Sequence, residues 1–132
     1  MLILIIDDDP DDQGLFREAI QAVDPSIICQ YASDGEQALQ KLVAQDLMPD
    51  FIFLDVNMPI MDGREFIIQL KSRSRLKDVP VFVFSTTSND KENTQFRNLG
   101  ARDFIIKPHK FQTLVYEVGA IVKGSGQRIF AS

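Results

Sequence analysis

A run of four apolar residues that ends in an aspartate, Phe51-Ile52-Phe53-Leu54-Asp55, decides the fold of this chain. Four consecutive apolar residues are too few for a buried helix and are typical of a strand covered on both faces of a parallel sheet. Open α/β sheets place their ligands in the crevice beyond the carboxyl ends of such strands. We therefore expect Asp55 at a strand-to-loop corner near the mouth of a cleft. For Asp55 alone, a solvated turn residue or a helix cap is the simpler alternative.

The residues after Asp55 predict a turn followed by a helix. Pro59 and Gly63 are typical turn residues. Asp62 with Glu65 three positions later is a capping-box pattern, which marks the start of a helix.

The chain contains four further short runs that are wholly or mostly apolar, at residues 2–6, 27–31, 81–84 and 104–106; only the second includes a polar residue, Gln30. Each run is followed by a segment that reads as a helix, and Asp9-Pro10 and the Ser33/Glu36 pair are start signals of the first two. Five strands, each followed by a helix over a short connection, predict an α/β fold. This fold is a doubly wound, five-stranded parallel sheet between helices, joined by right-handed crossovers.

The fourth helix, at about residues 89–99, is the weakest of the five. Its only large apolar residues are Phe96 and Leu99. We therefore expect it to be the most loosely held element. Gly100 is placed to end it in the left-handed conformation.

The charge of the chain is concentrated in one loop. The 132 residues, enough for one domain with a hydrophobic core, include 19 acidic and 14 basic residues, for a net charge of −5. Five acids lie within six residues, and the remaining 14 acids balance the 14 bases; the five are Asp7, Asp8, Asp9, Asp11 and Asp12. Nucleic acid is therefore a poor candidate partner.

No segment reaches the roughly 18 consecutive apolar residues of a membrane span, so we expect no membrane partner. The single cysteine, Cys29, has no internal disulfide partner and lies in an apolar run, where a buried thiol is expected. These features predict a cytoplasmic protein.

Polar residues follow four of the five predicted strands. Asp7 and Asp8 come after the first, Asp55 after the third, Ser85 after the fourth and Lys107 after the fifth. Carboxylates crowded at one sheet edge repel one another unless a cation neutralises them, and oxygen ligands alone favour a hard ion such as Mg²⁺. A carboxylate beside such an ion can accept a phosphoryl group, whose oxygens an ammonium and a hydroxyl would stabilise.

These motifs, in this order, resemble the response-regulator receiver domain, the phospho-acceptor of two-component signalling, in a chemotaxis-regulator-like form. The resemblance covers nearly the whole chain, and its motifs are Asp7-Asp8, Asp55, Met58-Pro59, Asp62-Gly63, Ser85 and Lys107-Pro108. It implies the flavodoxin-like (βα)₅ fold with strand order 2-1-3-4-5. It also implies a receiver domain at residues 1–123, and we expect residues 124–132 to form a short tail.

The resemblance assigns a role to each site residue. Asp55 would be the phospho-acceptor, and Mg²⁺ would be held by Asp7, Asp8, Asp55 and the backbone carbonyl of Asn57. Ser85, Lys107 and Phe104 would bind the phosphoryl group or switch with it, Phe104 by swinging inward. Asn57 and Thr87 would tune the lifetime of the phosphoryl bond, and the Lys107–Pro108 bond would be cis.

The same resemblance implies how the protein works. It would be a stand-alone receiver that takes phosphate from a histidine kinase or phosphotransfer protein and acts as a switch, not as a turnover enzyme. Phosphorylation would change a protein-interaction surface around the fourth helix, fifth strand and fifth helix. The downstream target is unknown, and the state is a monomer or a phosphorylation-dependent dimer. The basic segment 71–77 is a solvated connection or a second contact surface.

Three other functions are compatible with parts of the sequence. Asp7-Asp8-Asp9 after a strand imitates the Asp-x-Asp of haloacid-dehalogenase-type phosphohydrolases, although Asp11 stands where that family has Thr or Val. A flavodoxin-like cofactor binder shares the topology, but an aspartate-rich first loop would repel a cofactor phosphate. A constitutive adaptor without phosphorylation is the third.

Some acidic and basic residues have plainer explanations. Asp9 is a helix cap, Asp11 and Asp12 are surface acids of a first helical turn, and His109 is a surface residue.

Overall fold

The computed structural model describes residues 1–56, 62–86 and 90–124. Its five strands form one parallel sheet in the order β2-β1-β3-β4-β5, which confirms the predicted doubly wound α/β fold. The strands are β1 (Leu2–Ile6), β2 (Ile28–Ala32), β3 (Phe51–Asp55), β4 (Val81–Ser85) and β5 (Asp103–Ile106).

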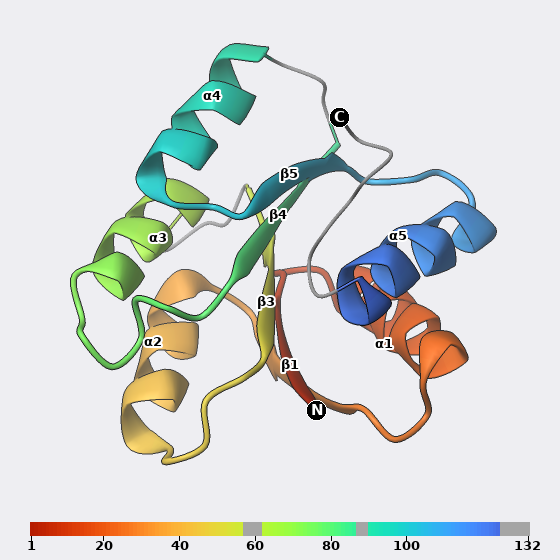
Figure 1. The fold of residues 1–132 in the computed structure, drawn as a ribbon, viewed down its shortest axis with the longest axis horizontal. Coiled ribbons are helices and arrows are strands. Elements are labelled where there is room, and N and C mark those ends of the chain that lie inside the picture. The colour runs from red at the N-terminus through yellow and green to blue at the C-terminus, as the bar shows by residue number, and fades with distance from the viewer. Residues whose placement is uncertain (57–61, 87–89, 125–132) are drawn as a thin grey trace.

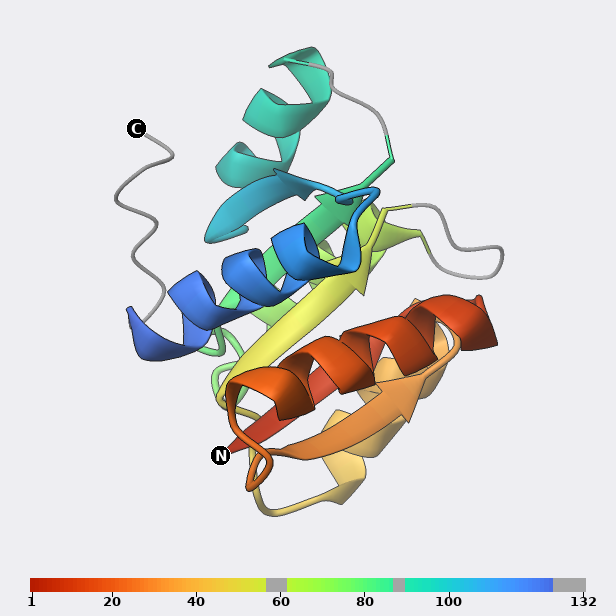
Figure 2. The ribbon, with the colours of Figure 1, turned by 90° about the vertical axis from the view of Figure 1, so that its right-hand side faces the viewer.

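Helices cover both faces of this sheet (Figure 1). They are α1 (Pro10–Val23), α2 (Gly35–Ala44), α3 (Gly63–Lys71), α4 (Asp90–Leu99) and α5 (Phe111–Lys123). Helices α1 and α5 lie side by side on one face, as Figure 2 shows, and α2, α3 and α4 cover the other. Among the described residues, no helix is long and apolar enough to cross a membrane.

Two hydrophobic clusters, one on each face, explain why the central strands β1, β3 and β4 are apolar at nearly every position. In β1, Leu4 and Ile6 point into the cluster beneath α2, α3 and α4, while Ile3 and Ile5 point into the cluster beneath α1 and α5. Each such side chain contributes about 1.5–3 kcal/mol when it is fully buried. The central strands are thus held from both sides.

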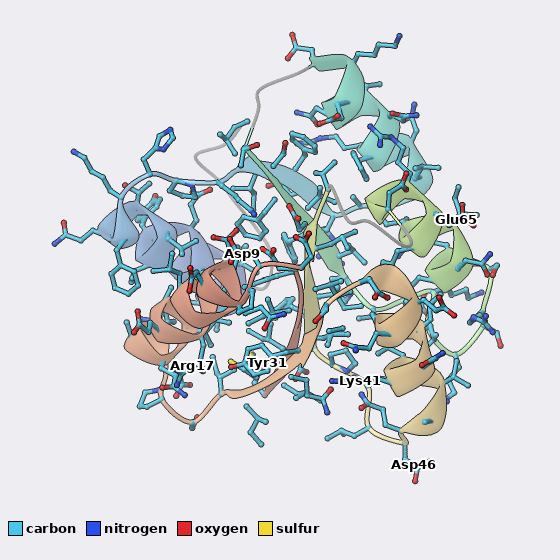
Figure 3. The ribbon with its side chains drawn as sticks, turned by 180° about the vertical axis from the view of Figure 1, so that it is seen from behind. Asp9, Arg17, Tyr31, Lys41, Asp46 and Glu65 are labelled. Carbon is cyan, nitrogen blue, oxygen red and sulfur yellow. The ribbon has the colours of Figure 1, made fainter. Side chains whose placement is uncertain are left out.

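Aspartates are the N-caps of three helices in the part of the chain that the structure describes. Asp9 caps α1 by accepting from the backbone N–H of Asp11, and Asp62 caps α3 by accepting from that of Glu65, as predicted (Figure 3 labels Asp9). The prediction that Ser33 caps α2 is wrong. Asp34 is the cap, because its carboxylate reaches the N–H of Gln37.

Strand β2 is the sheet edge beside β1 and starts one residue later than predicted. Ile28 is 64% exposed there, and Cys29 is only half-buried, not buried as expected, because the edge strand lacks a neighbour on one side. Lys41 of α2 donates a hydrogen bond to the carbonyl of Tyr31 and closes part of this edge (Figure 3).

Helix α4 is held by few contacts, in line with its sequence. Phe96 is its one buried residue in the part that the structure describes, and it packs on Phe104 with ring centroids 5.8 Å apart. Arg64 of α3 lies 4.9 Å from the centre of the Phe96 ring and pairs with Glu92 at 3.2 Å. Gly100, with φ +114°, follows the helix in the left-handed conformation. The predicted tail lies outside the described residues, apart from Gly124.

Candidate functional site

The predicted site residues meet at one edge of the sheet. Asp7 directly follows β1, Asp55 ends β3, Ser85 ends β4 and Lys107 directly follows β5. Since all the strands are parallel, their carboxyl ends lie on the same side, as the arrowheads of β2 and β3 in Figure 2 show. The alternation of strands and helices therefore converts distant positions in the sequence into neighbours.

Three carboxylates form a cluster at this edge. Asp7, Asp8 and Asp55 each place a carboxylate oxygen so that the three atoms lie within 4.8 Å of one another. Asp7 is 1% exposed, Asp55 is partly buried and Asp8 is exposed, so the cluster opens to solvent on one side. Oxygen ligands in this number leave room for water and fit Mg²⁺. The fourth predicted ligand, Asn57, lies outside the described residues.

The position of Asp7 is fixed by its neighbours. Its carboxylate accepts a hydrogen bond from the backbone N–H of Asp9 at 3.0 Å. Its backbone carbonyl accepts one from the Gln13 side chain at 2.7 Å, and its N–H donates to the Ala32 carbonyl at 3.0 Å. The start of α1 and the end of β2 thus orient this carboxylate.

Lys107 joins the cluster as its counter-charge. Its Nζ lies 3.3 Å from Asp7 Oδ2 and 3.3 Å from Asp55 Oδ1. A third contact, 2.9 Å to Asp12 Oδ2, was not predicted. Asp12 is therefore not the plain surface acid that the sequence indicated. The signal was its spacing: Asp12 lies four residues before the buried Phe16 and so shares the sheet-facing side of α1.

The electrostatics of the site reflect burial and crowding. Burial raises the pKa of Asp7 to about 6, against the opposing effects of the Asp9 N–H and Lys107. Burial also raises the pKa of Asp55, and Lys107 partly offsets this. Burial alone would lower the pKa of Lys107, but the hydrogen bond to Asp12 and the charges of Asp7 and Asp55 raise it. The ammonium is therefore charged at neutral pH, whereas burial disfavours the ionised forms of Asp7 and Asp55 even with Lys107 beside them.

The remaining predicted residues lie beside the cluster. Ser85 is 2% exposed, and its carbonyl accepts from the Lys107 N–H at 2.6 Å. Phe104 is 6% exposed, so its ring is already inside and in contact with Phe96. Thr87 lies outside the described residues. His109 is exposed, as expected.

One feature implied by the family resemblance is not found in the structure. The Lys107–Pro108 bond is not cis in this structure. The trans form is the intrinsically preferred one, by about 0.5–1 kcal/mol for bonds that precede proline.

Comparison with known proteins identifies the family. The profile of the response regulator receiver domain matches residues 3–119. Transcriptional regulatory protein PrrA of Mycobacterium bovis is 31% identical over 130 residues, which are 98% of this chain and 53% of PrrA. The chain thus spans about half the length of this relative, and the stand-alone architecture stays a prediction.

Two solved structures are similar over nearly the full chain. The phosphorylated cyanobacterial phytochrome response regulator RcpA has a TM-score of 0.84 and 30% identity, with 92% of this chain and 91% of RcpA covered. The Mn²⁺-bound form of response regulator Rcp1 has a TM-score of 0.81 and 26% identity, with 97% and 96% covered. Both the profile match and the fold lead to one conclusion: the chain belongs to the family of response regulator receiver domains, the phosphorylation switches of two-component systems.

Proposed function

We propose that Asp55 accepts a phosphoryl group, in a Mg²⁺-dependent reaction, from a histidine kinase or a phosphotransfer protein. The observation that supports this most directly is the position of Lys107 Nζ, 3.3 Å from Asp55 Oδ1, beside a three-carboxylate cluster. A nucleophilic carboxylate, a fixed cation and a metal-binding set of oxygens stand together at one sheet edge. Phosphoryl transfer requires these groups, because its catalysis is mostly positioning and charge stabilisation.

The proposed step conserves atoms and charge. A carboxylate oxygen of Asp55 forms a bond to phosphorus while the phosphorus–nitrogen bond of a phosphohistidine breaks. The histidine nitrogen keeps the electron pair and takes up one proton from the buffered solvent. Lys107 and Ser85 would donate to the phosphoryl oxygens, and Asp7, Asp8 and Asp55 would hold Mg²⁺, which would neutralise charge on those oxygens.

The proposed output is a change in the surface formed by α4, β5 and α5. Phe104 lies on β5, one residue from the buried Asp103, and its ring touches Phe96, the one buried anchor of α4 among the described residues. Lys107 directly follows β5, the strand that carries Phe104, so a displacement of Lys107 could reach α4 along this strand. A downstream protein would read this surface. We place the exchange in the cytoplasm, in keeping with the free Cys29.

Labelling with a small phosphodonor tests the proposal. Acetyl phosphate and Mg²⁺ should add one phosphate per chain to the protein, observed by intact mass, and none to Asp55→Asn. Chelation of the metal should abolish the adduct. Equal labelling of the two proteins would reject Asp55 as the acceptor. Continuous hydrolysis of phosphate esters without a stable adduct would instead favour a phosphohydrolase.

A further inference from the structure

Asp12 has no role in the proposed reaction, yet it makes the shortest ion pair of Lys107. The Nζ–Oδ2 distance is 2.9 Å, against 3.3 Å to Asp7 and to Asp55. Asp12 is not part of the three-carboxylate cluster. Its carboxylate therefore contacts the cation of the site without belonging to the candidate metal ligands.

The backbone at Asp12 is fixed by the start of α1. Asp9 caps the helix, Pro10 occupies its first position, and Phe16, one turn after Asp12, is buried in the core. The Asp12 side chain is one-third exposed and that of Lys107 is 16% exposed, so water screens this pair only in part. The Asp12 carboxylate is thus a fixed negative charge on the α1 side of Lys107.

A phosphoryl group on Asp55 would compete with Asp12 for the same ammonium. Phosphorylation converts the Asp55 carboxylate into an acyl phosphate, whose oxygens carry more negative charge than the carboxylate did. Lys107 has three N–H donors, but a donor that stays bonded to Asp12 is not available to the phosphoryl oxygens. In addition, the negative charge of Asp12 repels the phosphoryl group directly.

We propose that Asp12 is a positioning residue that holds Lys107 toward α1 and thereby weakens the binding of a phosphoryl group at Asp55. The inference rests on the proposed function. According to this inference, Asp12 lowers the stability of the phosphorylated state relative to the unphosphorylated one. The alternative is a surface acid whose pairing with Lys107 has no consequence for the phosphoryl group.

A matched control is available in the same helical turn. Asp11 is exposed, neighbours Asp12 and has the same charge, and its backbone N–H bonds to the Asp9 cap. Asp11→Asn therefore removes the same charge from the same helix end without removing the contact to Lys107. Any effect of Asp12→Asn beyond that of Asp11→Asn is due to the position of the Asp12 carboxylate beside Lys107 and the phosphoryl site.

The test measures the affinity for beryllofluoride, an acyl-phosphate mimic that binds a carboxylate, by calorimetry at saturating Mg²⁺. Asp12→Asn should bind it about fivefold more tightly than the wild type, the upper effect expected of a partly exposed ion pair. Asp11→Asn should stay near the wild type. Asp12→Glu, which restores the carboxylate, should return the affinity toward the wild-type value.

Several results would overturn the inference. Affinity in Asp12→Asn equal to that in Asp11→Asn, or weaker, would show that Asp12 does not compete for Lys107. Loss of Mg²⁺ binding in Asp12→Asn alone would make Asp12 a metal ligand instead. Asp12→Ser serves as the second carboxylate-free variant if Asp12→Asn does not fold. Absence of beryllofluoride binding to the wild type would reject the proposed function itself, and this inference with it.

Discussion

Replacing Asp7 by Asn should stabilise the protein in the absence of metal, although Asp7 belongs to the site. Asp7 is 1% exposed and lies beside two other carboxylates, so its ionised form is disfavoured in the folded state. Asparagine keeps the Oδ1 acceptor for the Asp9 N–H, which the aspartate holds at 3.0 Å, and it removes the charge.

The pKa of Asp7 gives the magnitude and the sign of its effect on the free energy of unfolding. Its value in the folded protein is about 6, whereas its ordinary value is 3.8. Between these values the folded protein holds a proton that the unfolded chain has released, so the free energy of unfolding falls as the pH rises through this window. At about 1.4 kcal/mol per pKa unit, the contribution that is lost above pH 6 is about 3 kcal/mol.

Urea unfolding followed by circular dichroism measures this contribution. In a chelator at about pH 7.5, Asp7→Asn should be more stable than the wild type by about 2–3 kcal/mol, and at about pH 4 the two should be nearly equal. Asp46→Asn is the control, since it removes the same charge from an exposed position far from the site (Figure 3).

Two results would contradict this reasoning. One is a stability difference between Asp7→Asn and the wild type that is the same at both pH values. The other is a variant that is less stable than the wild type at the higher pH, which would mean that the pairing with Lys107 at 3.3 Å outweighs burial and crowding.

Two further predictions concern α4. Phe96→Ala should lower the free energy of unfolding by about 3–5 kcal/mol, because the ring is fully buried against Phe104, and hydrogen exchange should show the α4 amides losing protection first. Gly100→Ala should cost about 1–2 kcal/mol in thermal unfolding, since φ is +114° and the new Cβ would lie 2.9 Å from Lys71 Cε; an unchanged stability would mean that the turn relaxes.

The fold and most of the site could be predicted because they depend on local patterns. The apolar runs identify buried strands, and parallel topology then brings Asp7, Asp8, Asp55 and Lys107 to one edge without any knowledge of side-chain geometry. These four residues were predicted and are brought together by the structure. Their roles in phosphoryl transfer stay predictions.

The errors at the α2 cap and at Asp12 concern contacts that a local sequence pattern leaves open. Ser33 and Asp34 are adjacent candidates for the same helix cap, and the hydrogen bond from the Gln37 N–H to the Asp34 carboxylate decides between them. Asp12 was read as a surface acid because a charged first turn is usually solvated, yet one helical turn from Phe16 the same residue faces Lys107. Pairings between distant segments are absent from any local pattern.

The burial of Phe96 constrains how a signal could pass from the site to α4. Exposing a buried phenylalanine such as Phe96 costs about 3–5 kcal/mol. A ligand shifts a conformational equilibrium only by the difference between its binding free energies in the two states. To detach α4, Mg²⁺ or a phosphoryl group would have to favour the detached state by at least that cost, whereas a shift that keeps Phe96 packed avoids it. We therefore expect α4 to shift with Phe96 still packed on Phe104, and amide protection along α4 should survive Mg²⁺ and beryllofluoride; complete loss of that protection would show that the helix melts instead.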